Sequence, residues 1–259
     1  MRVRFLSVIP VLVCTLLLSA AAFAQQFNPR DLSGYWLRNT VRPKDQPPLT
    51  PAGVAAMKGR VPDSRARVPT ESTDPMYKCN PQGFPRLVWA ENEPIEFIML
   101  PDRVLQLFQW ERTLRELWLD GRELPSGENL ENLGPAWYGH SVARWDQDTL
   151  VVLTTGVDER AWLDDAGNPK SFDARYEERY RRIAADTIEG QLTIHDPKNF
   201  TASWVHPKST FRRMPLKDVT FFGWKGLFSG VTEAICAPMN EVDDYNKRFR
   251  DPAISGVGR

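Results

Sequence analysis

The sequence predicts an all-β protein whose antiparallel meander closes into a barrel or packs as a sandwich. From residue 94 onward, short apolar or alternating runs follow one another, separated by turn pairs such as Pro101-Asp102 and Asp120-Gly121. Such pairs join neighbouring antiparallel strands. Because no strand–helix alternation indicates a parallel sheet, a closed barrel or a sandwich is expected.

The N-terminus predicts an export signal. Arg2 and Arg4 precede an apolar run over 5–18, and Ala22-Phe23-Ala24 matches a small-x-small cleavage site. A membrane span needs about 20 apolar residues, so this run is too short for one. We expect cleavage after Ala24 and a mature protein that is periplasmic or secreted, without a membrane span.

One domain is expected after the signal segment, residues 1–24. Residues 25–90 hold a first strand over 31–37 and a proline-rich wrapping segment. One short helix is expected in that segment, because Thr50 can cap it, Pro51 suits its first turn and Gly59 can end it. Residues 91–237 are expected to form the barrel core and 238–259 a polar tail. The core strands are expected at 95–100, 104–110, 114–119, 141–145, 149–155, 175–183, 187–194, 204–213 and 219–228.

Alternation along the strand over 175–183 places Tyr176, Glu178, Tyr180 and Arg182 on one face. If that face points inward, Glu178 and Arg182 have to pair. A cross-strand ion pair on a solvated face is the favoured interpretation, and a buried carboxylate or a ligand-holding arginine is the alternative. On the partner strand, Gly190 indicates a close approach or a bulge.

The mature chain keeps two cysteines, Cys79 and Cys236. In an oxidising compartment a disulfide between them is expected, with two separately buried thiols as the alternative. Two thiols and three scattered histidines do not match a zinc site, so no metal is expected. No dinucleotide fingerprint, P-loop or nucleophile elbow occurs, so no cofactor is expected either.

The net charge and the aromatic content of the chain indicate which class of partner it binds. Removing the two signal arginines leaves 31 basic residues against 33 acidic ones, without a basic stripe, so nucleic acid is not expected as a partner. The chain has nine tryptophans and thirteen phenylalanines. Large aromatic side chains fill cores and line pockets for apolar ligands.

The run W-Y-G-H-S-V-A-R-W-D-Q-D-T-L-V-V over 137–152, with matching segments at 31–36, 162–164 and 178–182, resembles an uncharacterised family of exported bacterial proteins. The resemblance implies an exported, single-domain, lipocalin-like β-barrel and no particular reaction. Relatives carry histidine where this chain has Leu124, Lys170 and Arg175, and aspartate at Leu153. Any polyhistidine metal site of the relatives is therefore not intact in this chain.

His140 is the leading candidate for chemistry. It lies between Gly139 and Ser141 at a strand entrance, where it can act as a general acid or base, or tie a loop to a strand. Glu178 and Asp120 are the carboxylates that could orient it, although turn chemistry also explains Asp120. The residues expected to contact a ligand are Trp137, Tyr138, Arg144, Tyr176, Tyr180 and Arg182.

Three functions follow, in order of preference. The first is an exported barrel that binds a small apolar or aromatic compound. The second is a cofactor-free lyase, isomerase or hydrolase with His140 as general acid or base, which requires a cavity and a carboxylate beside the ring. The third is a structural envelope protein with a filled barrel.

Overall fold

The computed structural model describes residues 27–39, 41, 43–67, 71–90, 94–214, 236 and 241. The predicted signal segment (1–24), the predicted strand at 219–228 and all but one residue of the predicted tail (238–259) lie outside these residues.

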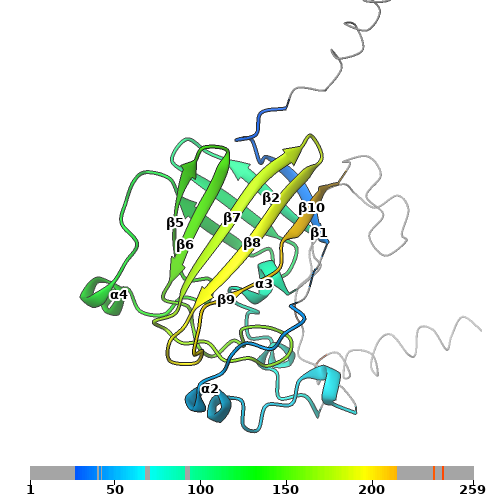
Figure 1. The fold of residues 1–259 in the computed structure, drawn as a ribbon. Helices are drawn as coiled ribbons and strands as arrows, with labels where there is room; N and C mark the ends of the chain where they lie inside the picture. The colour runs from blue at the N-terminus through cyan, green and yellow to red at the C-terminus, as the bar shows by residue number, and fades with distance from the viewer. Residues whose placement is uncertain are drawn as a thin grey trace, which may run out of the picture.

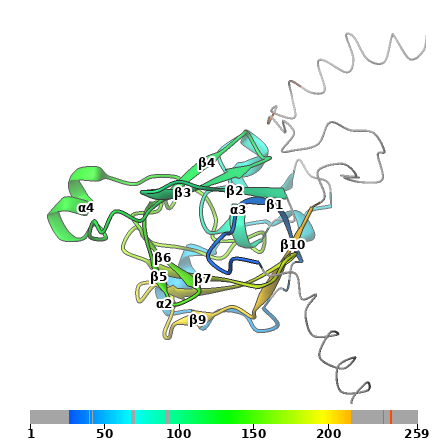
Figure 2. The same cartoon turned by 90° about the horizontal axis from the view of Figure 1, so that it is seen from above.

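The predicted all-β barrel is confirmed. Nine strands form a closed ring in the order β1 to β8 followed by β10, because β10 pairs with both β8 and β1 (Figures 1 and 2). The short β9 pairs with the far part of β8. The strands are β1 (Gly34–Asn39), β2 (Pro94–Met99), β3 (Arg103–Phe108), β4 (Leu114–Trp118), β5 (His140–Asp146), β6 (Thr149–Thr155), β7 (Arg175–Ala184), β8 (Thr187–His195), β9 (Trp204–Val205) and β10 (Ser209–Arg213).

The strand predicted over 204–213 is two strands, β9 and β10. Pro207 lies between them and has no backbone N–H to donate to a ladder. The chain therefore leaves the sheet after Val205 and returns at Ser209, where it pairs with Gly190 of β8. This break lets one segment contact both ends of β8.

The ring departs from a meander at one place. β4 and β5 run parallel and share a single register pair, Trp118 with Val142, whereas the other strand pairs of the ring share four to nine. A parallel connection needs a long crossover. Residues 119–139 supply it, and they include helix α4 (Gly127–Leu133), which stands away from the barrel wall in both views (Figures 1 and 2). We call this sparsely paired junction the seam.

Aromatic side chains fill the barrel. Trp36, Phe97, Tyr180 and Phe211 are among the largest fully buried side chains. Helix α3 (Arg86–Trp89) lies between the two walls of the barrel (Figure 2), and all four of its residues are buried. Trp89 stacks on Tyr180 with ring centroids 5.8 Å apart.

Gly190 makes the close approach that its position indicated. A Cβ on this residue would lie 2.7 Å from the Phe211 ring and 3.0 Å from the Trp89 ring. The missing side chain therefore provides the space in which α3 inserts its tryptophan. The sequence did not reveal α3, because its four-residue run Arg-Leu-Val-Trp is too short to show a helical period.

The wrapping segment contains the expected helix, α2 (Pro51–Ala56). Thr50 caps it by accepting a 3.0 Å hydrogen bond from the Gly53 backbone N–H. The helix ends three residues before Gly59, in a turn. The predicted Cys79–Cys236 disulfide is present, with Cα atoms 5.6 Å apart. Among the described residues, no helix has the length and apolar character needed to cross a membrane.

Candidate functional site

Alternate residues of β7 face the barrel interior. Tyr176, Glu178, Tyr180 and Arg182 are all buried, and Glu178 has no exposed surface. The interpretation of Glu178 as part of an ion pair on a solvated face is therefore wrong. Glu178 and Arg182 also do not pair with each other. Arg182 instead donates to the backbone oxygens of Ala185 at 2.6 Å and Asp31 at 2.7 Å.

Three donors surround the Glu178 carboxylate. Arg115 donates to Oε2 at 2.6 Å, while Trp89 Nε1 and the Tyr180 hydroxyl donate to Oε1 at 2.9 Å and 2.6 Å. A buried carboxylate is tolerated only when it is paired and hydrogen-bonded, as this one is. Burial, followed by the negative charge of Glu178, raises the pKa of Tyr180 well above its ordinary value, so its hydroxyl remains a donor.

Arg115 connects Glu178 to the other walls of the barrel. Its guanidinium donates to Gln106 Oε1 at 3.0 Å, Ser141 Oγ at 3.1 Å and Thr154 Oγ1 at 2.7 Å. It also lies over the Phe84 ring, 4.0 Å from the centroid. These residues form a polar network in an otherwise aromatic interior, and we call it the interior network.

Sequence reasoning missed Arg115, although a signal for it exists. In β4, Arg115 and Leu117 are buried while Leu114 and Glu116 are exposed. An arginine that alternates in step with a buried leucine indicates a buried cation that needs an anion. Trp89 had no comparable signal, because its approach to Glu178 depends on how α3 enters the barrel.

The seam opens into a cleft. This seam cleft has a volume of about 470 Å³ and lies between the outer faces of β4 and β5 and the crossover over 119–139. Three aromatic residues line it, Trp118, Trp137 and Tyr138, together with His140. Arg115 and Ser141 of the interior network also border the seam cleft. The structure thus brings together Trp137, Tyr138 and His140 from the predicted set.

The other predicted residues lie elsewhere. Tyr176, Tyr180 and Glu178 belong to the filled interior, and Arg144 is exposed on β5. None of these four is among the residues that line the seam cleft. The predicted single pocket uniting interior tyrosines with His140 is therefore not formed, because the barrel wall separates alternate residues of each strand.

His140 ties the crossover to the barrel. Its Nε2 lies 3.0 Å from the Gly134 carbonyl oxygen, just beyond the end of α4. A carbonyl oxygen only accepts, so Nε2 carries the proton and a neutral ring has its acceptor at Nδ1. The ring packs over Gly156, where a Cβ would lie 2.9 Å from its Cδ2 atom. Among the described residues, no carboxylate is hydrogen-bonded to this ring.

The charged groups around the seam cleft have partners of their own. Asp120 accepts from Arg122, with the shortest contact at 2.6 Å, and these hydrogen bonds lower the pKa of Asp120. Arg122 also covers the Trp118 ring at 3.7 Å. Glu116 pairs with Arg103 at 3.2 Å. A ligand in this cleft therefore gains mainly from contact with rings and apolar surface.

Lys170 is a buried cation near the interior network. Its Nζ donates to the Phe84 carbonyl oxygen at 2.7 Å, and the residue is only 4% exposed. Burial lowers the pKa of Lys170 to about 7, although the charge of Asp158 acts in the opposite direction. Gly83 lies against the amine, since a Cβ there would be 3.2 Å from Nζ.

Comparison with known proteins does not assign the chain to a family. No protein-family model matches the chain, and no curated protein matches it. Among the described residues, no group of three or more histidine, cysteine, aspartate or glutamate side chains is arranged to hold a metal ion. Functional inference therefore depends on the geometry of the clefts.

Proposed function

We propose that the protein is an exported β-barrel that binds a small apolar or aromatic compound in the seam cleft. The observation that carries the proposal is the single register pair between β4 and β5, which leaves an opening flanked by Trp118, Trp137 and Tyr138. Its volume of about 470 Å³ lies within the range of small-molecule sites, about 300–1,000 Å³. Export is supported by the Cys79–Cys236 bridge, since such bridges persist in oxidising compartments.

The ligand belongs outside the barrel interior. Large aromatic side chains and α3 occupy that space, and the Glu178 carboxylate is enclosed by its donors. In the seam cleft, by contrast, aromatic side chains border an open volume. A bound ring would lose contact with water against these side chains, a gain of about 25 cal/mol per Å² of apolar surface.

Binding is favoured over proton transfer. His140 faces the cleft, as a general base has to, but its described hydrogen-bond partner is a backbone carbonyl rather than a carboxylate. Asp120, the other candidate to orient it, is held by Arg122. The filled interior also fits a structural envelope protein, so the seam cleft is the feature that separates a binding protein from a structural one.

A neutral fluorescent probe tests the proposal. N-phenyl-1-naphthylamine is titrated into the disulfide-bonded mature protein, and its emission is followed. We expect saturable enhancement, with affinity falling about tenfold in Trp137→Ala, because one wall of the cleft is removed. Trp145→Ala is the matched control, since Trp145 is also a half-buried tryptophan but lies near the other end of β5 and does not line the cleft. No saturation in the wild type, or equal losses in both variants, would favour the structural alternative.

A further inference from the structure

A second cleft lies at the mouth of the barrel. This mouth cleft has a volume of about 160 Å³ and is bounded by α3, the wrapping segment near Asp45, the loop over 163–168 and the break between β9 and β10. Trp89 and Trp204 provide aromatic surface in it. It shares no lining residue with the seam cleft.

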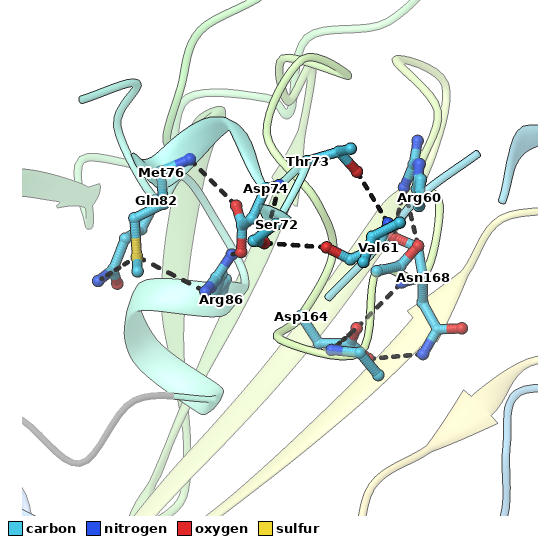
Figure 3. Close-up of polar contacts among 12 residues, drawn as sticks. Arg60, Val61, Ser72, Thr73, Asp74, Met76, Gln82, Arg86, Asp164 and Asn168 are labelled. Atoms are coloured by element: carbon cyan, nitrogen blue, oxygen red, sulfur yellow. Dashed lines mark hydrogen bonds and ion pairs between the residues drawn. The ribbon is translucent and has the colours of Figure 1, made fainter. Parts of the chain in front are cut away.

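A buried amide oxygen without a partner belongs to the lining. Asn168 is 2% exposed, and its Nδ2 donates to Asp164 Oδ2 at 2.7 Å. Figure 3 shows that the oxygen of the same side-chain amide, Oδ1, points away from Asp164. Oδ1 has no hydrogen-bond partner among the described residues. A buried acceptor left unsatisfied loses its hydrogen bonds to water without replacement, so a donor is expected there.

His206 supplies a second polar atom without a partner to the same cleft. Its ring lies edge-on against Trp204, with centroids 4.3 Å apart, and its Nε2 has no partner within the described part of the chain. Burial, with a smaller effect of the Arg38 charge, lowers the pKa of His206 to about 4. The imidazole is therefore neutral at pH 7, and in the tautomer protonated at Nδ1 its Nε2 is an acceptor for a bound donor.

The remaining polar groups of the mouth cleft are mainly carboxylates. Asp45, Asp164 and Asp165 line it, and no lysine or arginine is among the described lining residues. The loop carrying Asp164 is fixed, because Oδ1 accepts from the Ala166 and Asn168 backbone N–H groups at 3.0 and 3.1 Å. Figure 3 also shows Arg86 of α3 held by Asp74, at 2.6 Å, so the opposite wall is anchored as well.

Carboxylates, an amide oxygen, a neutral imidazole and two indole rings all favour a donor that carries positive charge. Aromatic faces attract ammonium groups, and carboxylates pair with them. A cavity of about 150 Å³ holds benzene, so the mouth cleft accommodates one small ring or a short branched skeleton. We propose that the mouth cleft binds a small organic ammonium compound through Asn168, the aspartates and the two tryptophans.

Three probes of nearly equal shape test the charge preference. Benzylammonium, benzyl alcohol and benzoate are titrated into the disulfide-bonded mature protein at pH 7 by isothermal calorimetry. We expect benzylammonium to bind at least fivefold more tightly than benzyl alcohol, and benzoate not to bind. Equal affinity for the three probes, or tighter binding of benzoate, would overturn the proposal.

A charge-matched pair of double variants locates the site. Asp45→Asn with Asp165→Asn removes two carboxylates from the mouth cleft. Asp148→Asn with Asp173→Asn makes the same change in net charge at two exposed positions outside it. Partly exposed ion pairs contribute about 0.2–1 kcal/mol each, so the first double variant should weaken benzylammonium binding roughly two- to thirtyfold. Equal weakening in the control would mean that only the overall charge is sensed.

Nitrogen–proton NMR spectra of the indole groups separate the two clefts. Benzylammonium should shift the indole signals of Trp89 and Trp204, which line the mouth cleft, and leave those of Trp118 and Trp137 unchanged. Shifts confined to Trp118 and Trp137 would place the ammonium in the seam cleft and refute the proposal. Failure of the naphthylamine titration has no bearing on this result, because the two clefts have separate walls.

Discussion

The seam cleft and the mouth cleft differ in how they arise and in how their polar groups are satisfied. The seam cleft results from backbone topology, since the crossover that joins the parallel strands β4 and β5 passes over the sparsely paired part of the wall. Its charged residues pair with their own neighbours. The mouth cleft results from packing of loops and α3, and Asn168 Oδ1 and His206 Nε2 have no hydrogen-bond partner among the described residues. The first cleft therefore suits apolar surface, and the second suits a donor.

The interior network lies between the two clefts. Trp89 lines the mouth cleft and donates to Glu178, and Glu178 accepts from Arg115, which borders the seam cleft. A change at Glu178 should consequently disturb both clefts. Changes further from it should affect one cleft more than the other, and the following predictions use this difference.

The largest effect is expected from removing the disulfide. The bridge closes a loop of 157 residues, so Cys79→Ser with Cys236→Ser should lower the free energy of unfolding by about 4–5 kcal/mol on the chain-entropy model. Cys79 follows the 3₁₀ helix η3 (Pro75–Lys78), which Asp74 caps while holding Arg86 of α3. Benzylammonium binding should therefore suffer more than naphthylamine binding. Urea denaturation measures the first effect, and a loss below about 1 kcal/mol would contradict it.

Glu178→Ala should destabilise the fold by about 3–5 kcal/mol, because Arg115 remains buried without its anion. Glu177→Ala is the matched control. It changes the neighbouring residue on the outer face, whose side chain is 40% exposed, and should cost less than about 1 kcal/mol. Denaturant titrations of both variants test the difference. Similar losses in the two would mean that the interior network contributes little to stability.

Lys170→Met should remove a pH dependence of stability. The pKa of Lys170 is about 7 in the folded protein, against an ordinary value of 10.5. Between these values the unfolded chain binds a proton that the folded protein lacks, so wild-type stability rises with pH, by up to about 1.4 kcal/mol per pH unit. The free energy of unfolding of the wild type should therefore rise relative to that of Lys170→Met as the pH increases. A constant difference between the two proteins would mean that the amine does not titrate in this range. Unfolding measured from pH 6 to pH 10 decides this.

His140→Ala should have the smallest effect on stability, about 1 kcal/mol, because it removes one hydrogen bond to the Gly134 carbonyl. Loosening of the crossover should weaken naphthylamine binding and leave benzylammonium binding unchanged. His195→Ala provides the control, since His195 is exposed and bonds only to Ser203 among the described residues. Equal probe affinities in wild type and His140→Ala would show that the crossover does not depend on this contact.

Local patterns in the sequence were sufficient for most of the fold. The strand positions, the Thr50 cap and the small residue at Gly190 depend on near neighbours. A period of two placed alternate residues of β7 on one face, but it did not show that this face points inward. The disulfide was predictable because only two cysteines remain after the expected signal segment. His140 was correctly placed at a strand entrance, at the first residue of β5.

The sequence by itself determined that the chain is built of antiparallel strands and that Glu178 shares one face of β7 with Tyr176 and Tyr180. Only the tertiary structure decided that this face is buried and which residues donate hydrogen bonds to the Glu178 carboxylate. Arg115 lies 63 residues away from Glu178 and Trp89 lies 89 away, on a strand and a helix whose approach depends on barrel closure. The parallel seam and the mouth cleft likewise arise from long connections that fold back on the barrel. Alternation along one strand specifies a face, but contacts between distant strands and loops require the register of the whole sheet.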